Sequence, residues 1–322
     1  APNDEGNGFK AIIAIADVSY YVRPGSALDR EAAKRGNSVY FPDRVVPMLP
    51  HALSSDKCSL RAGEDRAVLA CHLNIDAKGN VTSWRFTRAI ARISANIPYA
   101  DAQAAIDGEQ ESEHLADLKN LWACWKLLKS ARDRRAPLAL DMPERRITLD
   151  EEGRVTGVAL REHLDAHQVV EDFMIAANVA AAKALEEQKS PLIYRIHETP
   201  SREKLVALKD YLKTFDIEFA LGQVIKPATF NAILEKVTDD EIRPQIMESV
   251  LRSQTQAIYT PQNAGHFGLS LGSYAHFTSP IRRYADLLVH RALVNGFQLE
   301  QPAPRGELKP TSGLSDRDRD DL

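Results

Sequence analysis

The chain has 322 residues, of which 44% are hydrophobic and 27% are charged, and its formal net charge at pH 7 is −4. This composition suits a globular protein with a large core, and it excludes the strongly basic class of nonspecific nucleic-acid binders. The three cysteines are far apart and form no CxxC pair, which argues against a disulfide framework and a zinc site and favours the cytoplasm. No apolar run approaches the roughly 18 residues of a membrane span, so no membrane partner is expected.

The first ninety residues favour strands and loops. An isoleucine-rich apolar run from Phe9 to Val18 predicts a buried strand that ends near Asp17. Three prolines between Val39 and Pro50 exclude a regular helix there and predict an ordered, extended loop. Alternating apolar and polar residues on both sides of a glycine-containing turn predict a hairpin from Val68 to Ile75 and Val81 to Ile93.

After Tyr99 the apolar residues follow the period of a helix. One stripe predicts a long helix from Glu113 to Arg134, and its members are Leu115, Leu118, Leu121, Trp122, Trp125 and Leu128. A second hairpin is predicted from Leu138 to Val158, with its turn at Glu152 and Gly153. Further helices are predicted over Asp165 to Gln188, Pro200 to Phe215, Asp239 to Gln256 and Ser279 to Asn295. The sequence therefore predicts an α+β fold with a mixed or antiparallel sheet flanked by helices.

The segment from Tyr274 to Leu293 carries the strongest chemical signal. Ser279 and the proline after it suit the start of a helix, which would place Arg282 and Arg283 in its first turn. The helix dipole disfavours cations at that end, and a bound phosphate would reverse the sign of this effect. The structural alternative is that Arg283 pairs with Asp286 on the next turn, and that Arg282 pairs with a carboxylate elsewhere.

Three other features could contribute to a site. Glu171 and Asp172 lie in a nearly apolar helix, so they must be exposed, paired with an arginine, or turned towards a cleft. The glycine-rich segment from Asn263 to Leu271 could shape a binding cleft, or it could only join two elements. Tyr40 and Tyr99 occupy proline-containing loops, where they could stack on bases or simply hold the loops in place.

Several long segments of the chain match the motifs of one family, in the family's order. They are AIADVSYYVRPGSALDREAAKRGNSVYFPDRVVPMLP, CSL at 58–60, VVEDFMIAAN, YRIHETPS and GHFGLSLGSYAHFTSPIRRYADLLVHRAL. With these motifs the chain resembles the catalytic RNB domain of the ribonuclease II / ribonuclease R exonucleases, and the ribonuclease R branch is the closer match. The resemblance implies an RNB catalytic domain over residues 1–306, followed by a polar segment over residues 307–322.

The resemblance also implies an activity and its catalytic residues. Enzymes of this family hydrolyse single-stranded RNA from the 3′ end to nucleoside 5′-monophosphates, and Mg²⁺ is their cofactor. In this sequence, Arg282 would hold the scissile phosphate, with Arg283 beside it. Glu171 would contact the ribose of the 3′-terminal nucleotide, where the 2′-hydroxyl distinguishes RNA from DNA.

The same resemblance assigns RNA-binding residues outside the catalytic group. Tyr40 would stack on the terminal bases, and Tyr99 would contact the 3′-terminal nucleotide. His276, within the longest motif, is assigned to RNA binding as well. A stacking phenylalanine of some members is replaced here by Leu140, which argues against a two-sided aromatic clamp.

The chain departs from the family pattern at both ends. The acidic cluster DxxxxxDxDD that supplies the family's metal ligands would lie just upstream of Phe9, and Asp4 and Glu5 do not reproduce its spacing. No metal ligand is therefore assigned, and Mg²⁺ is not expected to bind properly to this chain. Nor do we expect a cold-shock or S1 domain within these 322 residues. We expect part of a monomeric enzyme, truncated at both ends and inactive alone; the alternative is a noncatalytic RNA-binding or scaffold protein with the same fold.

Overall fold

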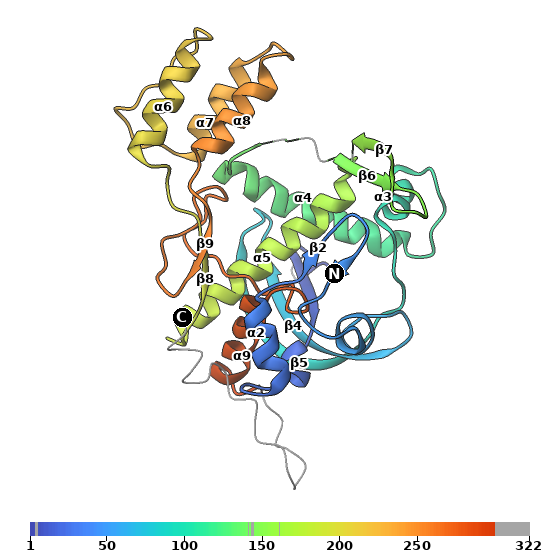
Figure 1. The fold of residues 1–322 in the computed structure, drawn as a ribbon. Helices are drawn as coiled ribbons and strands as arrows, with labels where there is room; N and C mark the ends of the chain where they lie inside the picture. Colours follow the sequence, from blue (N-terminus) through green and yellow to red (C-terminus); the bar gives the residue numbers. More distant parts are fainter. Residues whose placement is uncertain (4–5, 141, 143–144, 161, 300–322) are drawn as a thin grey trace.

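The structure is a computed structural model, which describes residues 1–3, 6–140, 142, 145–160 and 162–299 of the chain. Figure 1 shows a body of strands and long helices, from which three further helices extend to one side. The combination of helices and antiparallel strands confirms the predicted α+β class. The polar segment predicted over residues 307–322 lies outside the described residues.

The strands form one three-stranded sheet and three small two-stranded sheets, and every named pair is antiparallel. The larger sheet has the order β1 (Phe9–Ala16), β4 (Asp65–Ile75), β5 (Val81–Arg92). The small sheets pair β2 (Val39–Tyr40) with β3 (Val45–Val46), β6 (Arg145–Leu149) with β7 (Val155–Leu160), and β8 (Tyr194–Ile196) with β9 (Ile258–Thr260). The first predicted strand is confirmed, but the prediction that it is buried was wrong, because β1 lies at the edge of the sheet and Ile12 is exposed. Both predicted hairpins are confirmed, the second with its first strand beginning at Arg145 and not at Leu138.

The helices include all five that were predicted from the sequence. In chain order they are α1 (Val18–Tyr21), α2 (Ala27–Arg35), the π-helix η1 (Ala52–Lys57), α3 (Tyr99–Asp107), α4 (Leu115–Arg135), α5 (Asp165–Glu187), α6 (Arg202–Lys213), α7 (Pro227–Lys236), α8 (Arg243–Ser253) and α9 (Tyr284–Gly296). The prediction for α9 was wrong at its start, which is Tyr284 and not Ser279. No helix that the structure describes is both long and apolar enough to cross a membrane.

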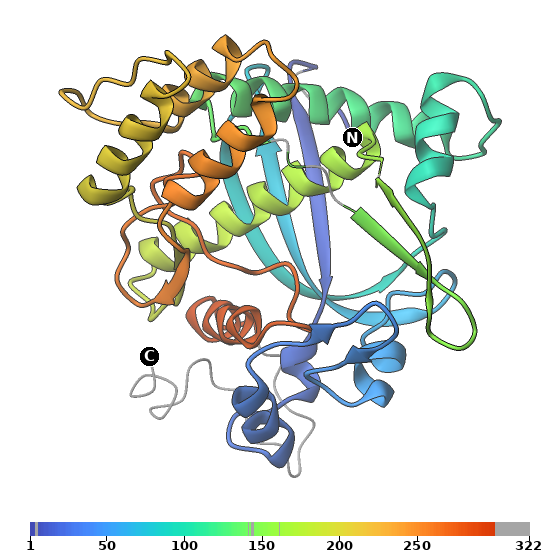
Figure 2. The ribbon, with the colours of Figure 1, turned by 45° about the horizontal axis from the view of Figure 1, so that its top comes forward.

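The main core lies between the three-stranded sheet and α5, which crosses one face of the sheet (Figure 2). The helix can lie close to the strands because its buried face is rich in alanine, a small side chain. Trp122 and Trp125 of α4 and Leu288 of α9 complete this core, as expected for the two tryptophans. Leu121, which was predicted on the same stripe, is exposed instead, and Cys124 is buried in its place.

A turn glycine fixes how the first hairpin meets α4. Gly79 has a positive φ of 78°, and a Cβ at this position would lie 1.9 Å from the carbonyl oxygen of Leu127. Only glycine allows both this backbone conformation and this close approach.

Helices α6, α7 and α8 form a separate unit with a core of their own. Its fully buried side chains include Leu212, Phe230 and Ile246, one from each helix. A third, smaller cluster joins α1 and α2 to α9 through Val18, Ala32 and Leu287.

Candidate nucleic-acid interface

The two predicted phosphate-binding arginines lie in a turn before α9, so the prediction that they occupy its first turn was wrong. The backbone N–H groups of Arg282 and Arg283 both donate to the Ser279 carbonyl, at 3.1 Å. Arg283 is then extended, with φ −135° and ψ 126°, and forms an isolated bridge with Asn37. This contact with a distant segment holds the chain extended and delays the helix. The two cations therefore precede the helix, with Arg283 at its N-cap position, and do not lie in its first turn.

Arg283 is held by a carboxylate, as the structural alternative predicted. Its Nε and Nη2 donate to the two oxygens of Asp286 at 2.7 and 2.8 Å. Asp286 is fully buried and also accepts from the Ser279 backbone N–H at 2.7 Å. Burial lowers the pKa of Arg283, but the hydrogen bonds and charge of Asp286 outweigh it and raise that pKa overall. A two-point pair of this kind fixes the guanidinium and offsets its charge.

Arg282 is different, because its side chain is exposed. Among the described residues it has no side-chain hydrogen bond and no ion pair, so the predicted carboxylate partner elsewhere is not found. Its backbone carbonyl accepts from the Ser38 N–H at 2.9 Å, which anchors the main chain while the side chain stays available. The turn thus presents one uncompensated cation to solvent.

The two acids of α5 have separate environments. Asp172 is 5% exposed and accepts from Trp125 Nε1 at 2.8 Å and from Arg132 Nη1 at 2.9 Å. This pairing with an arginine confirms the alternative for Asp172. Glu171 is exposed and has no side-chain hydrogen bond or ion pair in the part of the chain that the structure describes. Glu171 is therefore the acid that is available for a ligand.

Asn178 ties α5 to the loop that leads to the arginines. Its amide nitrogen donates to the Tyr274 hydroxyl at 3.0 Å, and its amide oxygen accepts from the Phe277 N–H at 2.8 Å. Glu171 lies two helical turns before Asn178, on the same face of α5. Burial raises the pKa of the Tyr274 hydroxyl, which also feels the charges of Arg283 and Glu171. The loop that leads to the arginine turn is thus fixed to the helix that carries Glu171.

The predicted tyrosines lie at the ends of short elements and are exposed. Tyr99 is the first residue of α3, and its ring centroid lies 4.3 Å from that of His167 with a 30° angle between the planes. His167 precedes Glu171 by one helical turn, so Tyr99 stands close to Glu171. Tyr40 is the last residue of β2 and is 60% exposed. It follows Asn37, the partner of the arginine turn, by three residues.

His276 joins this group through a tyrosine that the sequence did not indicate. The Tyr259 hydroxyl lies 2.7 Å from His276 Nδ1, and the two ring centroids are 5.6 Å apart. Burial and the positive charges of Arg283, Arg195 and Arg282 lower the pKa of His276 to about 3. The imidazole is therefore neutral at pH 7 and can donate one N–H. Arg195, Tyr259 and Asn178 were not predicted as site residues. Arg195 lies in the motif YRIHETPS and Asn178 in the motif VVEDFMIAAN, whereas Tyr259 lies in none of the quoted motifs.

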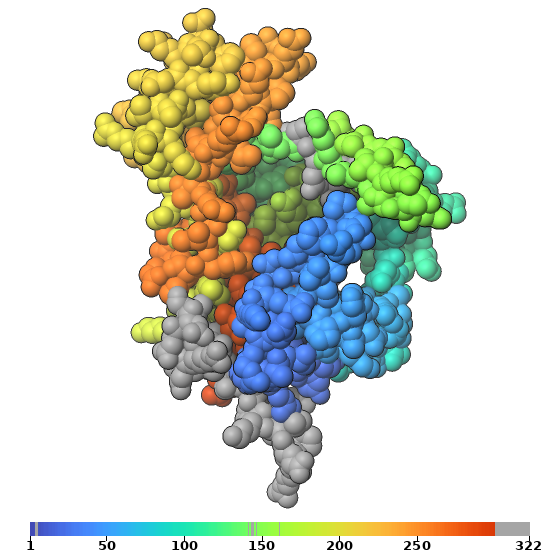
Figure 3. Space-filling model, in the orientation of Figure 1, coloured from blue at the N-terminus to red at the C-terminus, as the bar shows by residue number. Residues whose placement is uncertain are grey.

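The glycine-rich segment does line a cavity, as one of its two readings predicted. The cavity has a volume of about 590 Å³ and is bordered by residues 263–267 and 270–272, by the start of α7, and by His197 and Arg135. Gly268 is needed beside it, because a Cβ there would lie 2.8 Å from His197 Nδ1. Figure 3 shows the molecule hollowed between the helical unit, the β2–β3 segment and the β6–β7 hairpin.

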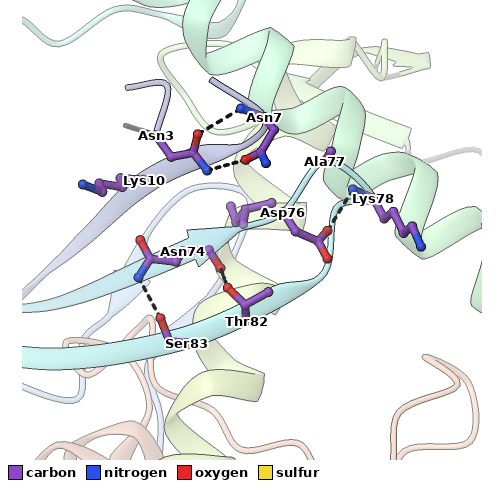
Figure 4. A pocket seen from close by; sticks show the side chains of 10 residues that line it. Asn3, Asn7, Lys10, Asn74, Asp76, Ala77, Lys78, Thr82 and Ser83 are labelled. Atoms are coloured by element: carbon purple, nitrogen blue, oxygen red, sulfur yellow. Dashed lines mark hydrogen bonds between the residues drawn. The ribbon is translucent and has the colours of Figure 1, made fainter. Parts of the chain in front are cut away.

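A second cavity, of about 540 Å³, lies at the far end of the sheet (Figure 4). Its lining is polar and comes from the first residues of the chain and from the β4–β5 turn, where Asp76 accepts from the Lys78 N–H at 2.8 Å. As far as the described residues go, it includes none of the six predicted site residues. It is therefore separate from the candidate interface.

Comparisons with known proteins identify the family. A model of the RNB domain matches residues 2–298. Ribonuclease R of Vibrio parahaemolyticus is 39% identical over 311 residues, which cover 95% of this chain and 37% of that protein. Ribonuclease R of Escherichia coli is 40% identical over 296 residues, which cover 89% of this chain and 36% of that protein.

Solved structures agree. Mycoplasma genitalium RNase R in complex with ribose-methylated single-stranded RNA matches with a TM-score of 0.84 and 31% identity, over 89% of this chain and 46% of that one. The yeast pseudonuclease Ssd1 shares the fold, with a TM-score of 0.73 and 21% identity over 95% of this chain and 38% of that one. The chain spans less than half the length of these relatives. Because the family model covers nearly the whole chain, this protein belongs to the RNB domain family.

Proposed function

We propose that this chain is the catalytic domain of a 3′-to-5′ exoribonuclease that hydrolyses single-stranded RNA to nucleoside 5′-monophosphates. The observation that carries the proposal is the hydrogen bonding of Asn178, which ties α5, the helix that carries Glu171, to the loop that leads to the exposed cation of Arg282. The relatives named Ribonuclease R, one of them solved with single-stranded RNA, support the same activity. The fold alone does not decide it, because a pseudonuclease shares it.

The catalytic roles follow from what each side chain has available. Arg282 offers a planar set of N–H donors to the scissile phosphate, where charge develops during hydrolysis. Arg283, held by Asp286, keeps the turn in place and adds positive charge next to it. Glu171 accepts hydrogen bonds from the ribose hydroxyls of the 3′-terminal nucleotide, which selects RNA over DNA.

Exposed rings guide the RNA to these groups. Tyr99, beside His167, contacts the 3′-terminal nucleotide, while Tyr40 stacks on the terminal bases. Stacking on an aromatic ring contributes about 1–3 kcal/mol per base without sequence preference. His276 donates its single N–H to the RNA backbone as a neutral group.

Magnesium is the cofactor that the family resemblance implies, to activate water and stabilise the departing oxygen. Such a cation is bound mainly through carboxylate oxygens. Across the residues that the structure describes, no three His, Cys, Asp or Glu side chains lie close enough together to hold a metal ion. Asp172 and Asp286 are committed to arginines. These residues therefore do not fit a magnesium site, and we expect this chain alone to turn over RNA very slowly.

We further propose that the protein is a monomer of the cytoplasm. All three cysteines are free and buried. Burial raises the pKa of Cys58 and of Cys71 to about 12, so these thiols remain protonated and unreactive. Unpaired thiols of this kind suit a reducing compartment.

A degradation assay on the complete protein tests the proposed activity. A single-stranded oligoribonucleotide with a 5′ fluorophore is incubated with Mg²⁺, and a deoxyribonucleotide of the same sequence serves as control. We expect the RNA to shorten from its 3′ end with release of nucleoside 5′-monophosphates, and the DNA to persist. Shortening from the 5′ end, or equal cleavage of DNA, would contradict the proposal. Binding without any product would favour the noncatalytic RNA-binding protein instead.

A further inference from the structure

Arg195 stands on the same surface as the arginine turn, but none of the roles above uses it. It lies in β8 directly opposite Tyr259 of β9, and opposed residues of an antiparallel pair project to the same side. The guanidinium carbon of Arg195 lies 4.7 Å from the centroid of the Tyr259 ring. The stacked ring fixes the plane of the guanidinium without occupying its N–H donors.

Tyr259 connects Arg195 to the RNA-binding group. Its hydroxyl is hydrogen-bonded to His276, whose ring also lies 5.5 Å from that of Tyr274. The Arg195 backbone N–H donates to the Tyr274 carbonyl at 2.9 Å, and the chain continues from Tyr274 through His276 to Arg282 within eight residues. Arg195 is therefore fixed to the short segment that ends in the arginine turn. If the Tyr259 hydroxyl donates to Nδ1, the proton of His276 resides on Nε2, which becomes a donor on this surface.

The charges of this group are unbalanced. Arg283 is offset by Asp286, but within the described residues Arg195 and Arg282 have no carboxylate partner. Both positive charges favour the deprotonated forms of Tyr259 and His276, as expected for cations near this pair. Arg195 is also half-buried, so its unused donors are partly screened from water. A surface with two unpaired guanidinium groups and a neutral N–H donor favours an anion with more than one charged centre.

We propose that Arg195, together with His276, forms a second phosphate subsite that binds the RNA phosphodiester adjacent to the one held by Arg282. The subsite rests on the proposed exoribonuclease function and extends it. Arg282 contacts the phosphate of the bond that is cleaved, whereas Arg195 fixes the direction and register of the strand. A single phosphate contact would let the RNA pivot about Arg282. Two contacts at neighbouring phosphates hold the backbone along a line, as phosphate contacts do in other nucleic-acid complexes.

Binding measurements on the complete protein test the subsite without turnover. The affinity for a fluorescent single-stranded oligoribonucleotide is measured by fluorescence anisotropy over a range of salt concentrations. A metal chelator is present so that the RNA is not hydrolysed. We expect Arg195→Ala to weaken binding by about 10- to 100-fold, the loss of a charge-assisted hydrogen bond. The slope of log K against log salt should become shallower by about 0.7, the value for one phosphate on a single strand. Arg195→Lys should restore the slope but only part of the affinity.

Uncharged linkages in the RNA backbone show which phosphate each arginine binds. A series of oligoribonucleotides carries one methylphosphonate, moved stepwise from the 3′ end. Wild-type protein should lose affinity at two neighbouring linkages. Arg195→Ala should become insensitive at one of them and Arg282→Ala at the other. Arg252→Ala, which removes an exposed arginine paired with Glu248 on α8, should retain both sensitivities.

The outcomes separate the subsite from the function. Unchanged affinity and salt slope in Arg195→Ala, while Arg282→Ala behaves as expected, would overturn the subsite alone. Equal sensitivity of Arg195→Ala and wild type to every methylphosphonate would do the same. If wild-type protein does not prefer RNA with a free 3′ end, the proposed function itself fails. Thermal melting verifies that each variant is folded, and Arg195→Lys provides the test if Arg195→Ala is not.

Discussion

The sheet body and the three-helix unit of α6–α8 are built on different kinds of core. In the sheet body the core is interrupted by buried polar side chains, which include Asp172, Asn178, Asp286 and His290. In the described residues of α6–α8 the helix interfaces are apolar, and the buried polar residues Ser253 and Gln254 lie at the end of α8. A buried polar group costs free energy unless its partners are in place. In the sheet body, the buried polar groups lie where α5 and the arginine turn are held in fixed positions relative to each other.

Removing Asp172 should cause the largest loss of stability. Its carboxylate is the partner of Arg132 and Trp125, so Asp172→Ala leaves a guanidinium largely buried and uncompensated. We expect the free energy of unfolding to fall by about 3–5 kcal/mol. Urea denaturation followed by tryptophan fluorescence measures this loss, because all three tryptophans, at 84, 122 and 125, lie in the sheet body.

Phe230→Ala is the matched change in the other unit. It should cost a comparable 3–5 kcal/mol through the cavity that it leaves in the α6–α8 core. RNA affinity should fall in Asp172→Ala, since Glu171 is its neighbour, and should persist in Phe230→Ala. An equal loss of RNA affinity in both variants would contradict the proposal that the sheet body alone positions the RNA-binding residues.

Arg282→Ala should have the next largest effect, and on activity alone. Loss of one donor to a developing charge typically lowers kcat by about 10²- to 10³-fold. The melting temperature should not change, because the Arg282 side chain is exposed and has no partner among the described residues. Steady-state turnover of single-stranded RNA by the complete protein provides the measurement, with Arg252→Ala on α8 as control. Unchanged turnover would refute the phosphate role.

The stability of the sheet body should depend on pH below about 6.5. Burial lowers the pKa of His290, and burial with nearby cations lowers that of His276 to about 3. In the unfolded chain both titrate near 6.5, so below that pH the unfolded state binds protons that the folded state excludes. Stability is therefore full above pH 6.5 and falls as the pH falls, by at most about 1.4 kcal/mol per pH unit for each histidine that stays neutral.

Urea denaturation between pH 5 and pH 7.5 measures this dependence, and His290→Gln should reduce it. His51→Gln, at an exposed position, is the control that should leave it unchanged. Residues 201–254, which contain α6–α8, have no histidine, so the stability of that unit should vary less with pH. If the free energy of unfolding changes equally with pH in wild type and His290→Gln, His290 is not a source of the pH dependence.

The smallest expected effect is at a helix cap of the three-helix unit. The Ser201 hydroxyl accepts from the Lys204 N–H at 3.3 Å and begins α6. Ser201→Ala should lower stability by about 1 kcal/mol without a change in RNA affinity. Thermal melting followed by circular dichroism tests the first part, and anisotropy tests the second. A weaker RNA affinity would mean that the helical unit contributes to the interface.

Much of the fold could be predicted because long elements repeat their pattern. Helices α4 and α5 each exceed twenty residues, and the β4–β5 hairpin has a glycine turn between two alternating strands. Helix α7 was missed because ten residues beginning with Pro227 give too short a pattern to recognise. Leu121 was assigned to the wrong face because its position on the helix lies at the boundary between the buried and the exposed face.

The candidate site could be predicted only where its contacts are local. The pair of Arg283 with Asp286 spans three residues and follows from their spacing. The start of α9 depends on Asn37, and the position of Arg195 depends on two strands of three residues each that pair across the chain. Such contacts leave almost no periodic signal in the sequence, so the sequence could not place the arginine turn or reveal Tyr259.

The bridge between Asn37 and Arg283 has a consequence for how the molecule folds. Ser38 donates to the Arg282 carbonyl and Gly36 accepts from the Tyr284 N–H, so the turn is completed by a segment from the opposite end of the chain. Contacts across such a separation close a long loop and form slowly. The helices should therefore appear first during refolding, and the ability to hold RNA should be acquired last.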